Sequence, residues 1–266
     1  MPDKISPAAI AFSEQSRVFD DLDRSNPLSV HLRQIFRAEV ERYLSPGSEI
    51  LELNCGTGLD AFYFASLGHR VLATDAAPGM IERVNEKRER SAGARVEAMQ
   101  LSYHDLAKLQ GRKFDHIVSN FGGLNCTGNL AQVLELLPGL LRRGGRVTLV
   151  IMPKVCPWEL MMLMKGKFRT AFRRLRKQTI AHVEGVRFNS YYYNPSFVKR
   201  RLRKSMRVLT LRGIFITVPP EFYSGFVERY PRLYRFLCKT DRLIGSVYPF
   251  NRWCDHFMIT LEKKDL

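Results

Sequence analysis

Short apolar runs alternate with amphipathic stretches along the first 152 residues of the chain. Residues 50–53 and 71–74 have the length and apolar character of buried strands, and the segment between them, 60–67, has helical spacing and ends at Gly68. The same alternation continues, with helices predicted at 78–91 and 130–141 and strands predicted at 96–101, 114–119 and 147–152. Strands that alternate with helices predict an α/β fold with a parallel sheet.

The remaining chain is longer than the closing elements of such a sheet require. Those elements are predicted to be a helix at 195–204 and strands at 208–216 and 257–261. Two insertions are left, at about 154–194 and 217–254. We expect the first to contain a helix from Cys156 and a hairpin around Gly185, and the second to contain a helix at about 226–237.

The N-terminal segment, 7–44, also has helical spacing. Residues 20–26 are expected to break it, and Pro27 to begin a second amphipathic helix. The chain is therefore divided into a helical cap, a core, and a C-terminal part that completes the core sheet and carries the two insertions as substrate lids. The expected bounds are 1–44, 45–153 and 154–266.

A glycine-rich turn follows the first strand of the core, and an acid ends the second. Gly56 and Gly58 let a ligand approach the backbone, because a Cβ there would clash with it. Asp75 offers two acceptor oxygens, which can take both hydroxyls of a ribose. Ala61 stands where a dinucleotide fingerprint has its third glycine. The unit thus predicts a ribose-containing ligand and departs from the dinucleotide pattern.

Four motifs in order resemble the class I S-adenosylmethionine (SAM) methyltransferases. Residues 52–58 read ELNCGTG, close to the family's acid-x-G-C-G-T-G, and Asp75 stands where the family has its ribose-binding acid. Residues 114–120 match the fourth strand, and 140–150 resemble the family's L-x-P-G-G turn into the fifth. The resemblance covers about 110 residues, from 45 to 152. It implies a Rossmann-like fold with a mostly parallel seven-stranded sheet, helices on both faces and a basic lid region.

The resemblance also implies the cofactor and its site. The cofactor is S-adenosyl-L-methionine and the product S-adenosyl-L-homocysteine (SAH). The implied cofactor-binding residues are Glu52, Asn54, Cys55, Gly56, Gly58, Asp75, Ala76, Met80, Ser102, Tyr103, Asn120 and Phe121. Asn54 replaces a glycine of the family's turn, and Ser102 stands where many members have an acid facing the adenine. Arg33 is interpreted as an exposed helix residue rather than a contact to the SAM carboxylate.

The chemistry of methyl transfer limits what the sequence can identify. The methyl group of SAM is already electrophilic, so the enzyme chiefly positions a nucleophile, and neither a metal nor a fixed general base is needed. We therefore expect no metal site and name no catalytic residue. The five cysteines include no C-x-x-C pair and are interpreted as reduced thiols. With no apparent signal peptide or membrane-spanning run, the protein is expected to be cytoplasmic.

Charge is distributed unevenly along the chain. The net charge is +16, yet residues 1–150 hold 18 basic and 18 acidic residues, so the whole excess lies in 151–266. This half is expected to attract anions. Within it, the apolar residues 160–164 precede a dense cationic stretch at 165–177. We interpret this segment as a lid helix; the alternative is an interfacial helix on an anionic membrane.

Three functions remain open at this point. The first is methyl transfer to oxygen or nitrogen of a small or amphipathic, anionic organic acceptor. The second is an RNA methyltransferase, disfavoured because no RNA-binding module is recognisable and the cations are interleaved with a large apolar lid. The turn after the fourth strand, SNFGGL, lacks the N/D-P-P-Y/F motif of amino-methylating DNA enzymes, which disfavours base-amine methylation of that type. The third is a non-catalytic SAM-binding or scaffold protein. No pattern specifies an oligomeric state.

Overall fold

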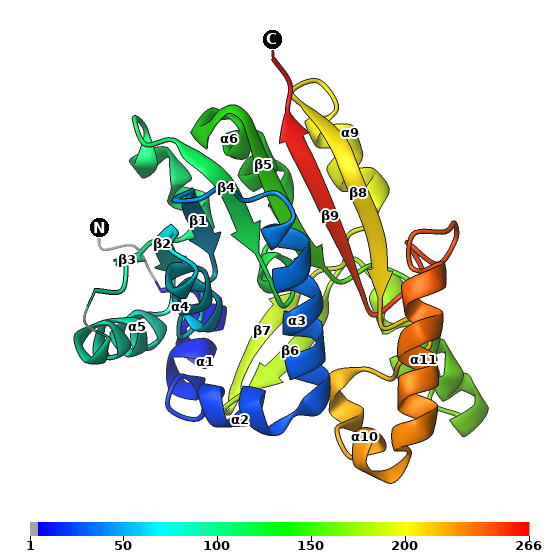
Figure 1. Cartoon of the computed structure of the whole chain (residues 1–266). Helices are drawn as coiled ribbons and strands as arrows, with labels where there is room; N and C mark the ends of the chain where they lie inside the picture. Colours follow the sequence, from blue (N-terminus) through cyan, green and yellow to red (C-terminus); the bar gives the residue numbers. More distant parts are fainter. Residues whose placement is uncertain (1–4, 92, 266) are drawn as a thin grey trace.

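Seven strands form one central sheet in the order β3-β2-β1-β4-β5-β9-β8, drawn across the middle of Figure 1. The computed structural model describes residues 5–91 and 93–265. The strands are β1 Glu49–Leu53, β2 Arg70–Asp75, β3 Val96–Gln100, β4 Phe114–Ser119, β5 Leu141–Ile151, β8 Met206–Ile214 and β9 His256–Lys263. The pairs from β3 to β5 are parallel, and β9 is antiparallel to both β5 and β8. The predicted fold class is confirmed.

Helices cover both faces of the sheet because the strand side chains alternate between two apolar cores. Ile50 and Val71 face a core that includes α3 Pro27–Glu41, whereas Leu51 and Leu72 face one that includes α6 Leu130–Leu140. The helices α4 Leu59–Ser66 and α5 Pro78–Arg90 join the first core, and α9 Pro195–Leu202 joins the second. Strands buried on both faces are expected for a parallel sheet.

The N-terminal segment forms three helices rather than two. Residues 20–26 were expected to break the helical run, but they lie largely within α2 Phe19–Ser25, which follows α1 Pro7–Gln15. Acidic residues in the first turn of α2, Asp20 and Asp21, favour this helix because they face its positive end.

The first insertion is fragmented where one long helix was expected. It contains the short elements α7 Pro157–Leu160, η3 Met161–Lys165, α8 Phe168–Ala171 and η4 Arg173–Leu175. Gly166 ends η3 in the left-handed conformation, with φ 67°, and breaks the helical path. The hairpin expected around Gly185 is present as β6 Thr179–Val183 and β7 Val186–Ser190.

The second insertion also divides its predicted helix in two. After η5 Glu221–Tyr223, the chain forms α10 Phe226–Arg229 and then α11 Pro231–Ile244. Pro231 begins the new helix because proline suits the first helical turn but not the interior. Figure 1 shows α10 and α11 on the side of the molecule away from β3.

Part of the cationic stretch at 165–177 lies inside the protein. Arg174 is only 4% exposed and donates to Glu159 and Asp255, while Arg173 makes a bidentate pair with Glu159 at 2.7 Å. Arg174 thus fixes the insertion to the residue that precedes β9, whereas Arg173 pairs within the insertion and is exposed. A lid helix with its whole basic face in water therefore does not describe Arg174.

No helix in the described part of the chain is long and apolar enough to cross a membrane.

Candidate functional site

A cavity of about 370 Å³ lies at the carboxyl-terminal edge of the sheet. Strands β1, β2 and β4 end there side by side, which is where ligands of open α/β sheets bind. Its lining comes from the N-terminal helices, the turn after β1, the ends of β2 and β4, and the second insertion. The lining residues are Phe12, Gln15, Phe19, Leu22, Asp23, Asn26, Ser29, Arg33, Glu52, Asn54, Cys55, Gly56, Leu59, Asp60, Asp75, Met80, Asn120, Phe121, Gly123 and Glu221.

The turn after β1 is left-handed at three positions. Asn54, Gly56 and Gly58 have φ values of 47°, 56° and 82°. Asparagine is among the side chains that tolerate this conformation best. Its side chain also connects the turn to β4, because Asn54 Nδ2 donates to the carbonyl of Asn120 at 3.1 Å and Oδ1 accepts from the Ser119 hydroxyl at 2.7 Å. The departure from glycine thus preserves the turn.

Asp75 holds this turn against the end of β2. Its Oδ2 accepts from the Gly56 amide at 3.0 Å and its Oδ1 from the Ala77 amide at 2.9 Å. Burial raises the pKa of this carboxyl to about 6, although its backbone hydrogen bonds favour the charged form. Each oxygen retains a lone pair. The carboxylate can therefore accept from two ligand hydroxyls without releasing the turn.

Glu52 presents an unsatisfied carboxylate to the same cavity. Its side chain is buried and its Oε2 has no hydrogen-bond partner among the described residues. Burial raises the pKa well above its usual range, and the nearby Asp60 adds to the effect. A buried carboxylate oxygen without a partner is costly unless a ligand supplies a donor or a positive charge.

A cluster of ion pairs joins the N-terminal cap to the core. Arg33 donates to Asp60 Oδ2 at 2.5 Å and makes a bidentate pair with Asp23, while Arg37 donates to Asp60 Oδ1 at 2.7 Å. The guanidinium of Arg33 also lies 4.4 Å from the centre of the Phe121 ring. Arg33 is only 8% exposed, so its interpretation as an exposed helix residue is wrong.

The cap also contacts the glycine turn and α5 directly. A Cβ on Gly56 would lie 3.7 Å from the Phe19 ring, and the Gly79 amide donates to the Ser13 hydroxyl at 2.8 Å. Lys87 reaches back from α5 to Asp20, with 2.6 Å between Nζ and Oδ2. The cap therefore closes the cavity on the side away from the sheet.

The described structure brings most of the implied cofactor residues together. Those that line the cavity are Glu52, Asn54, Cys55, Gly56, Asp75, Met80, Asn120 and Phe121. Gly58, Ala76, Ser102 and Tyr103 are not part of this lining. Ser102 instead caps η1 Tyr103–Leu109, where its hydroxyl accepts from the His104 amide at 3.2 Å.

Some cavity residues were not predicted from the sequence. Asp60, Asp23 and Glu221 belong to this group, as do the cap aromatics Phe12 and Phe19. Asp60 could have been suspected from its place in the first turn of α4, but its arginine partners are 27 and 23 residues away. Glu221 reaches the site from an insertion, and no local pattern indicates that position.

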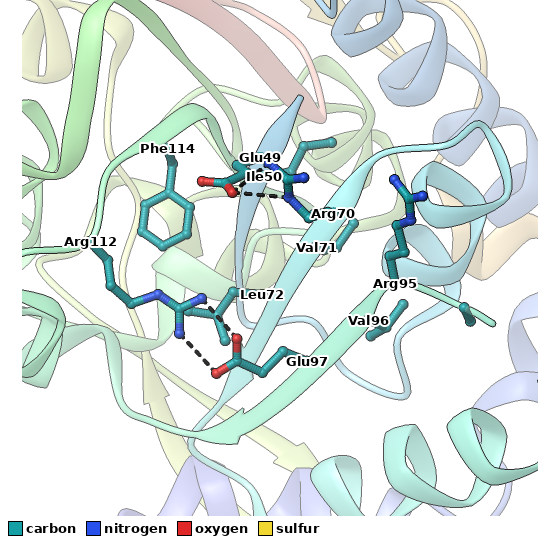
Figure 2. A pocket seen from close by; sticks show the side chains of 11 residues that line it. Glu49, Ile50, Arg70, Val71, Leu72, Arg95, Val96, Glu97, Arg112 and Phe114 are labelled. Atoms are coloured by element: carbon teal, nitrogen blue, oxygen red, sulfur yellow. Dashed lines mark hydrogen bonds and ion pairs between the residues drawn. The ribbon is translucent and has the colours of Figure 1, made fainter. Parts of the chain in front are cut away.

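A second cavity, of about 270 Å³, lies at the opposite edge of the sheet, where β1 to β4 begin. Figure 2 shows two ion pairs in it: Arg112 forms a bidentate pair with Glu97 at 2.8 Å, and Arg70 pairs with Glu49. Both carboxylates of this cavity are therefore paired, whereas Glu52 in the first cavity has an oxygen without a partner. The first cavity is therefore the candidate ligand site.

Comparison with known proteins agrees with this geometry. Residues 50–145 match the family described as a methyltransferase domain, and they contain the glycine turn, Asp75 and the end of β4. This part of the chain is therefore a methyltransferase domain of the class I SAM-dependent type. SAM is the methyl donor that defines this family, and the assignment made from the four motifs is confirmed.

Two curated relatives match part of this chain. One is a demethylmenaquinone methyltransferase of Clavibacter sepedonicus, 34% identical over 142 residues, which are 50% of this chain and 56% of that protein. Another is a ribosomal protein L11 methyltransferase of Thermosipho africanus, 35% identical over 111 residues, or 41% of this chain and 40% of that protein. The chain thus spans about half the length of the curated relatives it matches.

A solved structure extends the similarity over nearly the whole fold. The CcbJ methyltransferase of Streptomyces caelestis superposes with a TM-score of 0.62 and 14% identity, covering 96% of this chain and 98% of that one. At this identity the likeness concerns the fold alone. It shows that the additional C-terminal elements are compatible with the methyltransferase architecture.

Proposed function

We propose that this protein transfers the methyl group of SAM to oxygen or nitrogen of a small or amphipathic organic acceptor. The observation that carries the proposal is the single cavity in which the glycine turn, the Asp75 carboxylate and the unsatisfied Glu52 oxygen meet beneath the aromatic residues of the cap. Such a cavity combines a nucleoside site with an apolar wall.

The residues at the sheet edge fit the cofactor. Asp75 would accept from the two ribose hydroxyls, and Gly56 would leave room for the ligand beside the backbone. The Glu52 oxygen would accept from the cofactor's ammonium group or lie against its sulfonium charge. When bound, SAM supplies an electrophilic methyl group, and the chain positions the acceptor in line with it.

The cap side of the cavity suits an uncharged or weakly charged acceptor. Phe12, Phe19, Leu22 and Phe121 supply apolar surface there. The described lining contains five carboxylate side chains and one arginine, which is already paired. An acceptor that enters this cavity therefore gains little from negative charge. The excess positive charge of the C-terminal half therefore supports an anionic acceptor only if the acceptor's charged groups lie outside the cavity.

Glu221 is our candidate for accepting a proton from the acceptor. Its Oε1 is buried without a hydrogen-bond partner in the described structure, and its side chain lines the cavity. Burial raises the pKa of this carboxyl, so its ionised form is a stronger base than an exposed glutamate. The backbone carbonyl of Glu221 accepts from Asn26 Nδ2 at 3.0 Å, which joins this insertion to the cap.

The proposal is tested by methyl transfer from radiolabelled SAM to a panel of phenols, hydroxylated quinones and amines. Demethylmenaquinone is included because the curated relative from Clavibacter is named for it, and methylation of its ring carbon would contradict the oxygen-or-nitrogen part of the proposal. The expected result is labelled product with at least one acceptor. Glu221→Gln should retain SAH affinity and lose roughly 10²- to 10⁴-fold in kcat, the range for removing a general acid–base group.

The pH profile distinguishes this role from a structural one. In the wild type, kcat should rise with pH as Glu221 ionises, and this limb should disappear in Glu221→Gln. The pKa of Glu221 is raised, so the limb should lie at higher pH than for an ordinary glutamate. Equal pH profiles for the two proteins would refute the assignment.

A second candidate acceptor is a macromolecule, RNA or protein. The excess of basic residues in 151–266 favours an acidic partner, and the Thermosipho relative is named for a ribosomal protein. Transfer of label to ribosomal RNA or ribosomal protein, with strong inhibition by salt, would favour this alternative over the small-molecule proposal.

A further inference from the structure

The helix α11 carries three different faces around its axis. Its sequence, PRLYRFLCKTDRLI, places a cation directly before each residue of an outward apolar row. The apolar row is Leu233, Phe236 and Leu243, with the polar Thr240 between the last two, and the cationic row is Arg232, Arg235, Lys239 and Arg242. Both rows have the i, i+3, i+7, i+10 spacing of a helix stripe, so they run side by side along the helix.

The third face fixes α11 to the protein. Tyr234, Leu237 and Cys238 pack against the core that includes α3. Asp241 accepts from the amides of Ile216 at 2.9 Å and Thr217 at 2.8 Å. These contacts set the rotation of the helix and turn the other two faces outward.

The apolar row is exposed to an unusual degree. Phe236 is 64% exposed and Leu243 is 79% exposed, and the row continues beyond the helix into Val247 and Tyr248, which are also exposed. Single exposed apolar residues are common, but several large ones along one side of a helix indicate an interaction surface.

The cationic row is available for a partner. None of its four side chains forms an ion pair with a carboxylate in the described residues, in contrast to Arg173 and Arg174 of the first insertion. An arginine or lysine that is not neutralised locally remains free to bind anions. The surface therefore combines exposed apolar bulk with uncompensated positive charge.

The first insertion contacts the segments that precede and follow α11, and it also exposes large apolar residues. The two insertions touch through Trp158 and Tyr223, whose ring centres are 5.9 Å apart, and through a bridge between Val155 and Trp253. Met164 and Phe168 of the first insertion are also strongly exposed. In Figure 1, α11 stands at the lower right, and α9, at the top of the view, is far from it.

We propose that α11 docks this protein on an anionic lipid bilayer. The helix would lie in the interface with its apolar row among the acyl chains, and its cationic row would contact lipid phosphates and carboxylates. A second copy of the chain fits less well, because the same unpaired cations would face one another across the dimer. In the sequence, such a contact was the alternative to a lid for residues 160–177; the structure favours α11 instead, because that stretch is fragmented and two of its cations are internally paired.

The test is flotation of the purified full chain with lipid vesicles. We expect association with vesicles of phosphatidylcholine and phosphatidylglycerol, little association with phosphatidylcholine alone, and release at high salt. Phe236→Glu and Leu243→Glu should each lower the partition coefficient roughly tenfold or more, because each removes an apolar side chain that would insert among the acyl chains. Arg235→Gln and Lys239→Gln should each weaken it about fivefold.

Matched variants control for charge and for folding. Ile180→Glu places the same charge on an exposed apolar residue of β6, and Arg200→Gln removes an exposed cation of α9. Both should bind vesicles as the wild type does. Retained SAH binding and thermal melting in the α11 variants would show that they fold.

Three results would overturn the proposal. The first is no association of the wild type with anionic vesicles. The second is association that the α11 variants leave unchanged. The third is a dimer in solution that Phe236→Glu dissociates, with no vesicle binding, since this outcome would assign the surface to a second copy. Each is independent of whether an acceptor is found, so failure here leaves the methyltransferase proposal standing.

Discussion

Replacing Asp75 by alanine should weaken cofactor binding strongly and change the stability of the protein much less. Each carboxylate oxygen accepts one backbone amide, from Gly56 and Ala77, and keeps a lone pair for one ribose hydroxyl. Losing two charge-assisted hydrogen bonds at ~1.5 kcal/mol each amounts to ~3 kcal/mol of binding free energy. The dissociation constant for SAH should therefore rise by roughly 100- to 200-fold.

The free energy of unfolding should change much less. Burial raises the pKa of Asp75 from 3.8 to about 6, so holding this carboxylate ionised at neutral pH costs the folded state ~3 kcal/mol. Alanine removes that cost and leaves the amides of Gly56 and Ala77 without their acceptor, at ~1–3 kcal/mol each. The two effects oppose each other, and we expect a net change within about 2 kcal/mol.

The pH dependence of Asp75 follows from the direction of its shift. The folded-state pKa lies above the unfolded value, so the destabilisation is present above pH 6 and disappears as the pH falls toward 3.8. SAH affinity should change in the opposite sense, since a protonated carboxyl loses acceptor capacity. Wild-type affinity should fall as the pH drops through about 6, and Asp75→Ala should lack this step.

Isothermal titration with SAH, well above and well below pH 6, measures the affinity, and chemical denaturation measures the stability. The control is Glu97→Ala, which removes a paired carboxylate at the opposite edge of the same sheet (Figure 2) and should leave SAH affinity unchanged. Equal SAH affinities for wild type and Asp75→Ala would refute the role given to this residue.

Two further predictions concern packing around the site. Gly123→Ala would bring a Cβ within 2.3 Å of Asn54 Cγ, so it should displace that side chain and weaken SAH binding; Asn54→Gly should restore binding in the double variant, as titration would show. Arg174→Met should lower stability by ~3–5 kcal/mol, because it leaves the buried carboxylates of Glu159 and Asp255 without a principal partner. Thermal denaturation checks this, with the exposed Arg200→Met as the control; an unchanged melting temperature would contradict it.

Local sequence patterns predicted the core of the fold because its elements are specified locally. The run from residue 50 to Asp75 contains two apolar strands, a turn with Gly56 and Gly58 and a helix ended by Gly68, and each signal acts over a few residues. The structure places these elements as β1, α4 and β2, with the turn at the carboxyl edge of the sheet.

The parts that were missed depend on distant contacts or on subtle breaks. Asp60 is a cavity residue only because α3 places Arg33 and Arg37 against it, and no short-range pattern shows such a pairing. The prediction of one helix at 226–237 did not take Pro231 into account. A proline that begins a new helix is a local signal, so this break could have been predicted from the sequence. The burial of Arg174 depends on Asp255, which is distant in the sequence.

The most direct test of the central claim is a crystal structure of the protein with SAH. We predict SAH in the cavity at the carboxyl edge of the sheet, with both ribose hydroxyls within hydrogen-bonding distance of Asp75 and the ammonium group beside Glu52 Oε2. SAH bound elsewhere, or in this cavity with its ribose away from Asp75, would contradict it.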